Sequence, residues 1–139
     1  CLHQSGLGAL FLLAKGKIHP LWYTEFIPLL FLVSSVFSGM SVIIIEGSIT
    51  HKIFMHDNSP EAKAHESEII IGLSKVAAGA MFVYLFMQGI QLIHGQKVHL
   101  LFTSWGGLFL TEVLGFVLVP MLLFMRGVKT KNIITLRIA

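Results

Sequence analysis

The chain of 139 residues is 55% hydrophobic and 12% charged, and its mean hydropathy is +0.81. Soluble proteins average roughly 45–50% apolar and about 25% charged residues, so a soluble domain of this length could not bury the excess. The formal charge of +3 comes from scattered lysines and arginines, which argues against a nucleic-acid partner. We therefore expect an integral membrane protein whose surroundings are the lipid bilayer.

The first 24 residues form a polar segment, interrupted by glycines, ahead of the long apolar stretches. His3 and His19 lie on either side of its apolar part, SGLGALFLL. Such a segment can enter the membrane as a short re-entrant helix, or lie at the interface, and line an amphipathic pocket. We expect residues 1–24 to form a re-entrant or interfacial segment of this kind.

Three apolar stretches follow that are long enough to cross a hydrocarbon core of ~30 Å as helices. They cover about residues 26–45, 69–94 and 102–125, and the start of a fourth candidate span lies at Ile133. Ser59, Pro60 and Glu61 have the pattern of an N-cap, a first helical residue and a first-turn acid, so the second helix is predicted to begin outside the lipid. The predicted fold is an all-α, polytopic membrane domain over residues 1–139.

Lysine and arginine residues predict the orientation of these spans. Three lie on one side, and six lie on the other: Lys15, Lys17 and Lys97, against Lys52, Lys63, Arg126, Lys129, Lys131 and Arg137. Because cytoplasmic segments carry the excess of positive residues, the loop 46–68 and the tail after residue 125 are predicted to be cytoplasmic. Residues 1–24 and 95–101 are then predicted to be periplasmic, where Trp22, Tyr23 and Trp105 fit an interfacial aromatic belt.

Two charged residues lie inside the expected spans. Glu112 is ten residues into the third span, where a charged group costs at least ~2.5–3.5 kcal/mol on insertion scales. Two explanations stay open for it: a neutral carboxylic acid bonded to a neighbouring helix, or a member of a proton path or ligand site. Lys75 is about two turns inside the second span, close enough to extend its ammonium group to the cytoplasmic headgroups.

The histidines favour ligand binding over metal or haem binding. His3 and His19 flank the first segment, and a neutral imidazole can exchange hydrogen bonds with the carbonyl or hydroxyl of a quinone headgroup. His51, His56 and His65 lack metal-ligand spacing, and of the seven histidines only His94 falls in an expected span. A haem between spans needs axial histidines inside them, and the sole cysteine, Cys1, cannot form an internal disulfide. We expect no metal and no haem in this chain.

Several motifs together resemble one known family. The segments LHQSGLGALFLLAKGKIHPLWYTEFIPLLFLVSS and TEVLGFVLVPMLLF are similar to the polysulfide reductase NrfD/PsrC-type integral membrane subunits. The similarity is closest to the quinone-reactive membrane subunit, the so-called cytochrome b subunit, of the uptake nickel–iron hydrogenases. It covers nearly the whole chain and depends on His3-Gln4-Ser5, Gly8, His19-Pro20-Leu21-Trp22, Glu46-Gly47-Ser48, and Glu112 with Pro120.

This resemblance implies a multi-pass subunit of a bacterial or archaeal cytoplasmic membrane, of which the chain looks like a middle-to-late segment. It implies binding of menaquinone or ubiquinone without haem, and electron transfer between the quinone pool and a ferredoxin-like iron–sulfur subunit, with proton translocation in some members. The catalytic partner would be a hydrogenase or a molybdoenzyme. The candidate residues are His3, Gln4, Ser5, His19 and Trp22 for quinone binding or proton entry, and Glu112, Glu46 and Lys75 for a buried proton path or helix contact.

One departure from the family pattern occurs late in the second span. Relatives often carry an acidic residue there, whereas the segment QGIQLIH has Gln91, which argues against a proton path through that helix. Two other functions remain open from the sequence. The chain could be a transporter or channel component that uses Glu112 and Lys75, or a purely structural membrane anchor.

Overall fold

A computed structural model describes residues 1–54 and 60–139 of the chain. The protein is 83% helical, and the described ranges contain no strand, which confirms the all-α prediction. Within these ranges, three helices are long and apolar enough to cross a membrane, over Ile27–Thr50, Ala64–His94 and Ser104–Thr130. The prediction of three spans is therefore confirmed.

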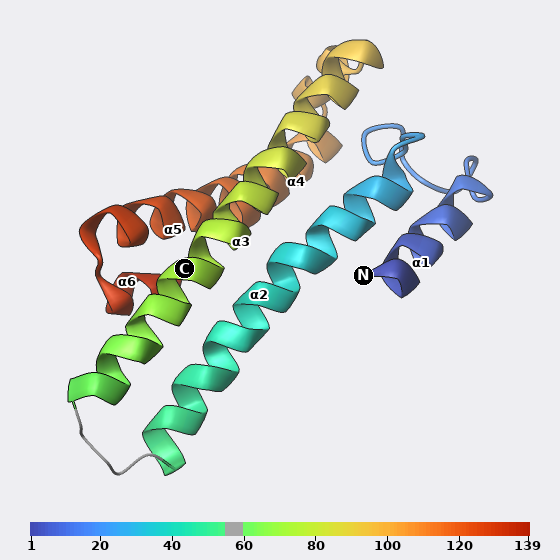
Figure 1. Cartoon of the computed structure of the whole chain (residues 1–139). Helices are drawn as coiled ribbons and strands as arrows, with labels where there is room; N and C mark the ends of the chain where they lie inside the picture. The colour runs from blue at the N-terminus through green and yellow to red at the C-terminus, as the bar shows by residue number, and fades with distance from the viewer. Residues whose placement is uncertain (55–59) are drawn as a thin grey trace.

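The short helix α1 (Leu2–Leu12) lies beside the first half of α2 (Ile27–Phe54), as Figure 1 shows. The two helices are in close contact at Gly8, which is buried. A Cβ atom at Gly8 would lie 2.9 Å from the Cα of Pro28 and 3.1 Å from the side chain of Phe31. An irregular segment, residues 13–26, connects the helices and covers the end of the bundle. Glycine at position 8 thus allows α1 to pack against the helix that follows it.

Helix α3 (Pro60–His94) runs antiparallel to α2 and lies against it along much of its length (Figure 1). Pro60 is its first residue and Glu61 is in its first turn, as the sequence predicts, whereas Ser59 lies outside the described residues. Much of the expected loop 46–68 is helical, because α2 continues to Phe54 and α3 begins at Pro60. Residues 46–54 contain no proline, so the helix can continue and keep its backbone groups hydrogen-bonded past the apolar stretch.

The third span is continuous over Ser104–Thr130 but changes its winding in the middle. A 3-10 turn, η1 (Val98–Phe102), precedes α4 (Ser104–Leu110), the π-helix η2 (Thr111–Leu118) and α5 (Val119–Thr130). The π-helix ends just before Pro120, whose ring would collide in an α-helix with the carbonyl of Phe116, four residues earlier. At this end the Val119 N–H bonds to the Leu114 carbonyl, five residues back. The wider winding accommodates the proline without ending the helix.

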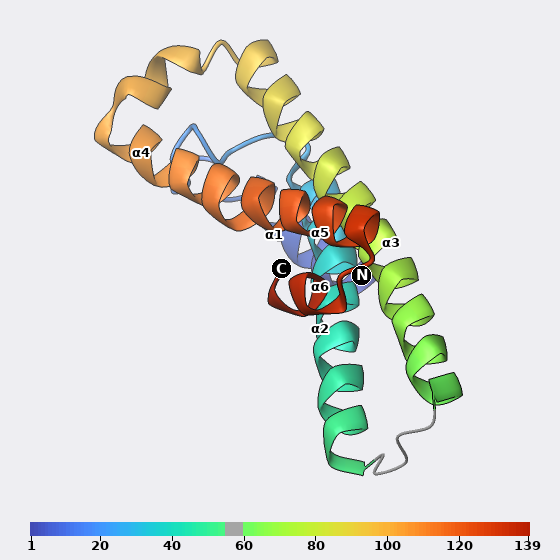
Figure 2. The same ribbon diagram turned by 90° about the vertical axis from the view of Figure 1, so that its left-hand side faces the viewer.

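A cluster of buried apolar side chains joins α2, α3, η2, α5 and the last helix, α6 (Ile133–Ile138). Lys131, in the left-handed conformation at φ 51°, ends α5, and Asn132 caps α6 by accepting from the backbone N–H of Ile134 at 3.1 Å. Figure 2 shows α6 turned back under α5. The core consists of Ile44, Ile70, Ala77, Ala78, Met81, Val117, Met121, Phe124 and Leu136. In this structure, the candidate fourth span that starts at Ile133 begins as a helix packed on this core.

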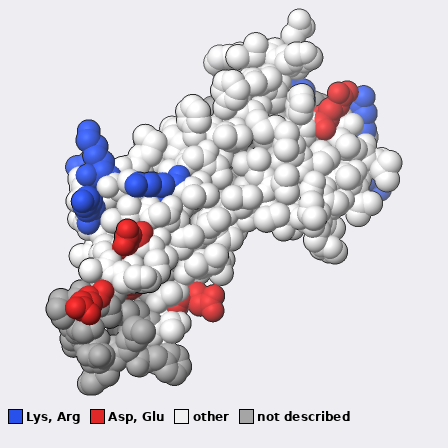
Figure 3. All heavy atoms as spheres, viewed as in Figure 1, with Lys and Arg blue, Asp and Glu red and all other residues white. Residues whose placement is uncertain are grey.

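Charged side chains are concentrated toward two ends of the molecule. In the face shown in Figure 3, the Lys, Arg, Asp and Glu atoms lie at the lower left and the upper right, and the broad middle region is uncharged. Large apolar side chains on α2 and α3, such as Ile45, Phe82 and Phe86, are exposed on the outside of this chain. Such an arrangement is suited to a hydrocarbon environment, with charged groups kept near the water on both sides.

Candidate functional site

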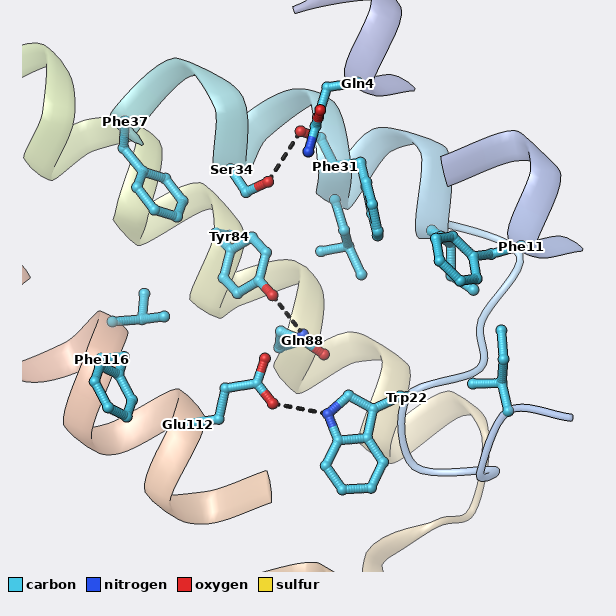
Figure 4. A pocket seen from close by; sticks show the side chains of 14 residues that line it. Gln4, Phe11, Trp22, Phe31, Ser34, Phe37, Tyr84, Gln88, Glu112 and Phe116 are labelled. Carbon is cyan, nitrogen blue, oxygen red and sulfur yellow. Dashed lines mark hydrogen bonds between the residues drawn. The ribbon is translucent and has the colours of Figure 1, made fainter. Parts of the chain in front are cut away.

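A cavity of about 570 Å³ lies among α1, the irregular segment 13–26, α2, α3 and η2. This volume is within the range of ~300–1,000 Å³ that is usual for small-molecule sites. Its walls include six aromatic side chains and five polar ones, and Tyr84 belongs to both groups (Figure 4). The lining residues are Phe11, Ile18, Trp22, Ile27, Leu30, Phe31, Phe37, Phe116 and Val117, with the polar residues Gln4, Ser34, Tyr84, Gln88 and Glu112. This aromatic cavity is the candidate site.

A hydrogen bond between Trp22 and Glu112 closes one side of the aromatic cavity. The Trp22 indole N–H donates to a Glu112 carboxylate oxygen over 2.7 Å, although the two residues are 90 positions apart in the sequence. Short N–H···O distances are typical when the acceptor is a carboxylate. The Trp22 ring also meets the ring of Phe109 edge-on, with centroids 5.7 Å apart and an interplanar angle of 77°. The segment 13–26 is thereby tied to the third span.

Two side chains near the end of the second span hold the backbone on either side of Trp22. The Gln91 amide donates to the Leu21 carbonyl over 2.8 Å, and the Lys97 ammonium donates to the Tyr23 carbonyl. Leu21 is fully buried, so its side chain anchors the segment as well. Burial lowers the pKa of Lys97 from its ordinary value. These contacts make the position of Trp22 a property of the fold and not of a loose loop.

His19 supports Trp22 from outside the aromatic cavity. Its ring contacts the rings of both Trp22 and Trp105, with a centroid distance of 5.7 Å to each. The Leu21 backbone N–H donates to His19 Nδ1 over 3.3 Å, so in the neutral ring the proton is on Nε2. His19 does not line the cavity, and its contacts are those of a residue that positions the Trp22 indole.

The π-helix η2 brings the Glu112 carboxylate to the aromatic cavity. Glu112, Phe116 and Val117 all line it, and the Glu112 side chain is exposed, not packed between helices. Short π-helical segments inside α-helices are frequent at functional sites. The sequence did signal this feature, because Pro120 in the middle of an apolar span requires an irregular helix. We had expected a uniform helix over 102–125, and the distortion that sets the direction of the Glu112 side chain was missed.

The structure brings some of the predicted site residues together and leaves others apart. Gln4, Trp22 and Glu112 line the aromatic cavity. On α1, His3 is exposed and Ser5 is half-buried, and neither lines it. Glu46 and Lys75 are both exposed, on α2 and α3, away from the cavity. The functional roles predicted for these residues remain predictions.

Two residues of the candidate site were missed in the sequence, Tyr84 and Gln88. The Gln88 amide donates to the Tyr84 hydroxyl over 3.1 Å, and Gln88 is only 6% exposed. With Gln91, which is 4% exposed, they follow the spacing i, i+4, i+7 that marks one face of a helix. A polar stripe on an apolar helix is therefore visible in the sequence. It indicates a face that meets protein or a polar cavity and not lipid.

A second cavity, of about 550 Å³, lies farther along α2 and α3. Its lining has four isoleucines and four polar residues. The isoleucines are Ile43, Ile44, Ile69 and Ile70, the polar residues are Glu46, Thr50, His65 and Glu66, and Gly47 and Leu73 complete the lining. We call it the isoleucine cavity. In the part of the chain that the structure describes, no three His, Cys, Asp or Glu side chains are grouped so that they could hold a metal ion.

These features define the class of the protein: it is an integral, multi-pass helical membrane protein with a polar and aromatic cavity among its helices. The family described as polysulphide reductase, NrfD, matches residues 5–138, and the chain belongs to this family. The resemblance inferred from the sequence motifs is thereby confirmed.

Two relatives illustrate the relationship. A protein of Nitratidesulfovibrio vulgaris (strain Hildenborough) is 41% identical over 139 residues, which cover 99% of this chain and 36% of that protein. The probable Ni/Fe-hydrogenase 2 b-type cytochrome subunit of Escherichia coli K12 is 30% identical over 134 residues, which cover 94% of this chain and 32% of that subunit. The chain spans about a third of the length of these relatives. No solved structure matches it.

Proposed function

We propose that this chain is part of the quinone-binding membrane subunit of a respiratory oxidoreductase complex. The observation that carries the proposal is the aromatic cavity, in which the Trp22–Glu112 hydrogen bond adjoins six aromatic side chains. Family membership supports a membrane subunit, and the similarity to a probable hydrogenase subunit of E. coli supports a hydrogenase-type complex. The ligand that we propose is menaquinone or ubiquinone.

The residues of the aromatic cavity fit a quinone headgroup. The headgroup is a flat apolar ring with two oxygens, and the cavity offers aromatic surfaces for a ring and polar groups for oxygens. Moreover, the Gln88 carbonyl oxygen is buried and has no hydrogen-bond partner among the described residues. Buried polar atoms are normally paired, so an unpaired one at a cavity wall favours a polar ligand there.

The chemistry proposed for these residues concerns protons, because a quinone takes up two electrons and two protons when it is reduced. The aromatic walls exclude water from the ring. The Glu112 carboxylate, held by the Trp22 N–H at 2.7 Å, accepts or returns a proton at a ring oxygen. The chain carries no redox group of its own in this proposal, so the electrons pass to or from a partner subunit.

That partner is proposed to be a ferredoxin-like iron–sulfur subunit, joined in turn to a catalytic hydrogenase or molybdoenzyme subunit. Its docking side is the end of the molecule that carries Trp22, Tyr23 and Trp105. The excess of lysine and arginine at the other end argues that the aromatic end faces the periplasm of a bacterial or archaeal cytoplasmic membrane.

Glu112→Gln tests the proposed function, since the amide retains hydrogen bonds but cannot accept a proton. In the purified complex, we expect quinone-linked electron transfer to fall by about 100-fold or more, the range for loss of a positioned acid–base group. Thr111→Val is the matched control, because the Thr111 hydroxyl bonds only to the Gly107 carbonyl of its own helix. Turnover and proton movement at the wild-type rate in Glu112→Gln would contradict the proposal and favour a structural anchor. Solute or ion transport without any quinone requirement would favour a transporter.

A further inference from the structure

Tyr84 and Gln88 form a polar pair within the aromatic cavity, and its hydrogen bonding is incomplete. The Gln88 amide N–H donates to the Tyr84 hydroxyl at 3.1 Å, while the Gln88 carbonyl oxygen is buried with no partner in the described structure. The Tyr84 ring is fixed by an edge-on contact with Phe37, with centroids 5.8 Å apart and an interplanar angle of 81°. Figure 4 shows the pair across from the Glu112 carboxylate.

The hydrogen-bonding inventory of this pair indicates what a ligand must offer. The Tyr84 hydroxyl already accepts one bond and retains its own proton to donate. The Gln88 carbonyl oxygen can only accept. The pair therefore retains two donors, the Tyr84 O–H and the second Gln88 N–H, and one unpaired acceptor, the Gln88 oxygen. A ligand hydroxyl can donate to that oxygen and also accept from Tyr84. A ligand carbonyl could accept from Tyr84 but would leave the Gln88 oxygen unpaired.

Glu112 also has a hydrogen-bond acceptor without a donor. One of its carboxylate oxygens accepts from Trp22, and no described residue donates to the other. The Ser34 hydroxyl proton is already used in a bond to the Phe31 carbonyl at 2.9 Å. The Gln88 oxygen and the second Glu112 oxygen are thus two acceptors at the cavity without a donor in the described structure. A ligand hydroxyl can donate to such an acceptor, whereas a ligand carbonyl cannot.

We propose that Tyr84 and Gln88 make the aromatic cavity selective for the hydroxyl-bearing, reduced form of its ligand. This proposal rests on the proposed function, and it specifies which redox form, quinol or quinone, binds more tightly. The ligand hydroxyl donates to the Gln88 oxygen and accepts from the Tyr84 hydroxyl. Because the Gln88 oxygen is closed to water, its amide must turn about the last side-chain torsion, which is a soft one, to meet the ligand. This turn gives up the bond from the Gln88 N–H to Tyr84, and the bonds of the ligand hydroxyl to both side chains replace it.

The quinol and the quinone have the same ring substituents and tail and differ at their oxygens. The difference between their affinities therefore reports on the contact of a ligand oxygen with Tyr84 and Gln88. One neutral hydrogen bond corresponds to about a three- to tenfold difference in affinity. We expect the wild-type complex to bind the reduced form tighter by this factor. A tenfold preference would raise the two-electron midpoint potential of the bound ligand by about 30 mV.

The experiment measures the dissociation constants of decylubiquinol and decylubiquinone separately on the purified complex. Gln88→Leu is expected to weaken quinol binding three- to tenfold and to leave quinone binding within about twofold. Tyr84→Phe is expected to weaken both forms, because the phenolic proton can be donated to either oxygen type. Ser41→Ala is the control, since the Ser41 hydroxyl bonds to the Phe37 carbonyl of its own helix and Ser41 lies outside the cavity lining. The ratio of the two constants should not change in that variant.

The ratio also keeps the test valid if a variant is destabilised, because both constants come from the same sample. Gln88→Met, which retains the length of the side chain, replaces Gln88→Leu if the latter does not assemble. Equal affinity for both forms in the wild type, or a preference for the quinone that Gln88→Leu removes, would overturn the redox selectivity and leave the quinone site standing. If neither the quinol nor the quinone binds, both the redox selectivity and the proposed function are wrong.

Discussion

Two cavities of nearly equal volume lie at opposite ends of the α2–α3 pair, and they differ in what surrounds them. The aromatic cavity, at about 570 Å³, is formed by residues from four helical elements and the segment 13–26. The isoleucine cavity, at about 550 Å³, is lined by α2 and α3 alone. Gln88, a lining residue of the first, has a buried oxygen without a partner, and no lining residue of the second has such an atom. We therefore assign the proposed site by the convergence of distant segments beside an unpaired polar atom, and not by volume.

The difference follows from how each end is packed. Near the isoleucine cavity, α2 and α3 adjoin the apolar core around Phe124 and Leu136, and two neighbouring helices suffice to form the walls. At the aromatic end, the π-helix η2, the segment 13–26 and α1 must all be held in place. Their positions depend on Gly8, Gly106 and the bonds on either side of Trp22. The aromatic end should accordingly be the more sensitive to substitution.

The largest effect is expected from Gly106→Ala. A Cβ atom at Gly106 would lie 2.2 Å from the Leu101 carbonyl oxygen, so α4 would have to move away from η1. Overpacking of this kind costs typically ~1–3 kcal/mol, and a clash with backbone should reach at least the upper end. Gly107→Ala is the matched control, because nothing lies within 4 Å of its Cβ position. Thermal unfolding of the purified complex should show a clear decrease for Gly106→Ala alone, and equal melting temperatures would argue against the tight η1–α4 contact.

Next in size is the contrast between two glutamates, one in each cavity. Glu112→Gln is expected to lower quinone-linked turnover by about 100-fold, whereas Glu46→Gln should stay within about twofold, because Glu46 lines the isoleucine cavity. Steady-state turnover with a soluble quinone analogue measures both. A loss in Glu46→Gln as large as that in Glu112→Gln would restore the sequence-based prediction that both belong to one proton path.

A smaller effect is expected from Trp22→Phe, which retains an aromatic ring but removes the N–H that donates to Glu112. Hydrogen bonds to charged groups contribute about 1.5–3 kcal/mol, and this bond is exposed, so we expect the lower end of that range, a fall in turnover of about tenfold. Trp105→Phe makes the same replacement at the other tryptophan that contacts His19, outside the cavity lining. It should leave turnover nearly unchanged. Identical losses in the two variants would mean that aromatic packing, and not the indole N–H, determines the rate.

The smallest effect separates Gln4 from its neighbour His3. Gln4 lines the aromatic cavity and His3 does not, so Gln4→Ala is expected to weaken quinone binding about threefold, the lower end for one hydrogen bond. His3→Ala should weaken it less. The sequence-based prediction gave both residues to quinone binding or proton entry and put the emphasis on His3, which would hydrogen-bond a quinone oxygen or pass its proton. A three- to tenfold loss in His3→Ala with none in Gln4→Ala would support that earlier assignment.

The three spans were predictable from sequence because hydropathy is summed over some twenty residues and tolerates local errors. The ends of the helices were less predictable. Nothing in residues 46–54 breaks a helix, so α2 continues to Phe54, beyond the residue 45 that apolarity alone suggested. Glu112 and Trp22 could each be singled out, the first by its cost in a span and the second by its position at an interface. Their hydrogen bond could not, because it joins residues 90 positions apart and depends on tertiary packing.

Tyr84 and Gln88 are an instructive omission. Their spacing with Gln91 was present in the sequence, but each residue alone is uncharged and inexpensive enough to be overlooked in an apolar span. The π-helix was likewise announced by Pro120, yet the number of residues over which the winding changes depends on the neighbouring packing. In apolar spans, polar stripes and prolines can therefore indicate a candidate site as well as charged residues do.

Photoaffinity labelling of the purified complex with an azidoquinone, mapped by peptide mass spectrometry, tests most directly whether the aromatic cavity is the quinone site. We expect the label on peptides that contain Trp22, Phe31, Tyr84 or Phe116, which line that cavity. Excess unlabelled quinone should suppress it, and Glu112→Gln should leave the labelled peptides the same, because it alters proton transfer more than binding. Label confined to the isoleucine cavity, on peptides with Ile43–Thr50 or His65–Leu73, or label that quinone does not suppress, would contradict the assignment.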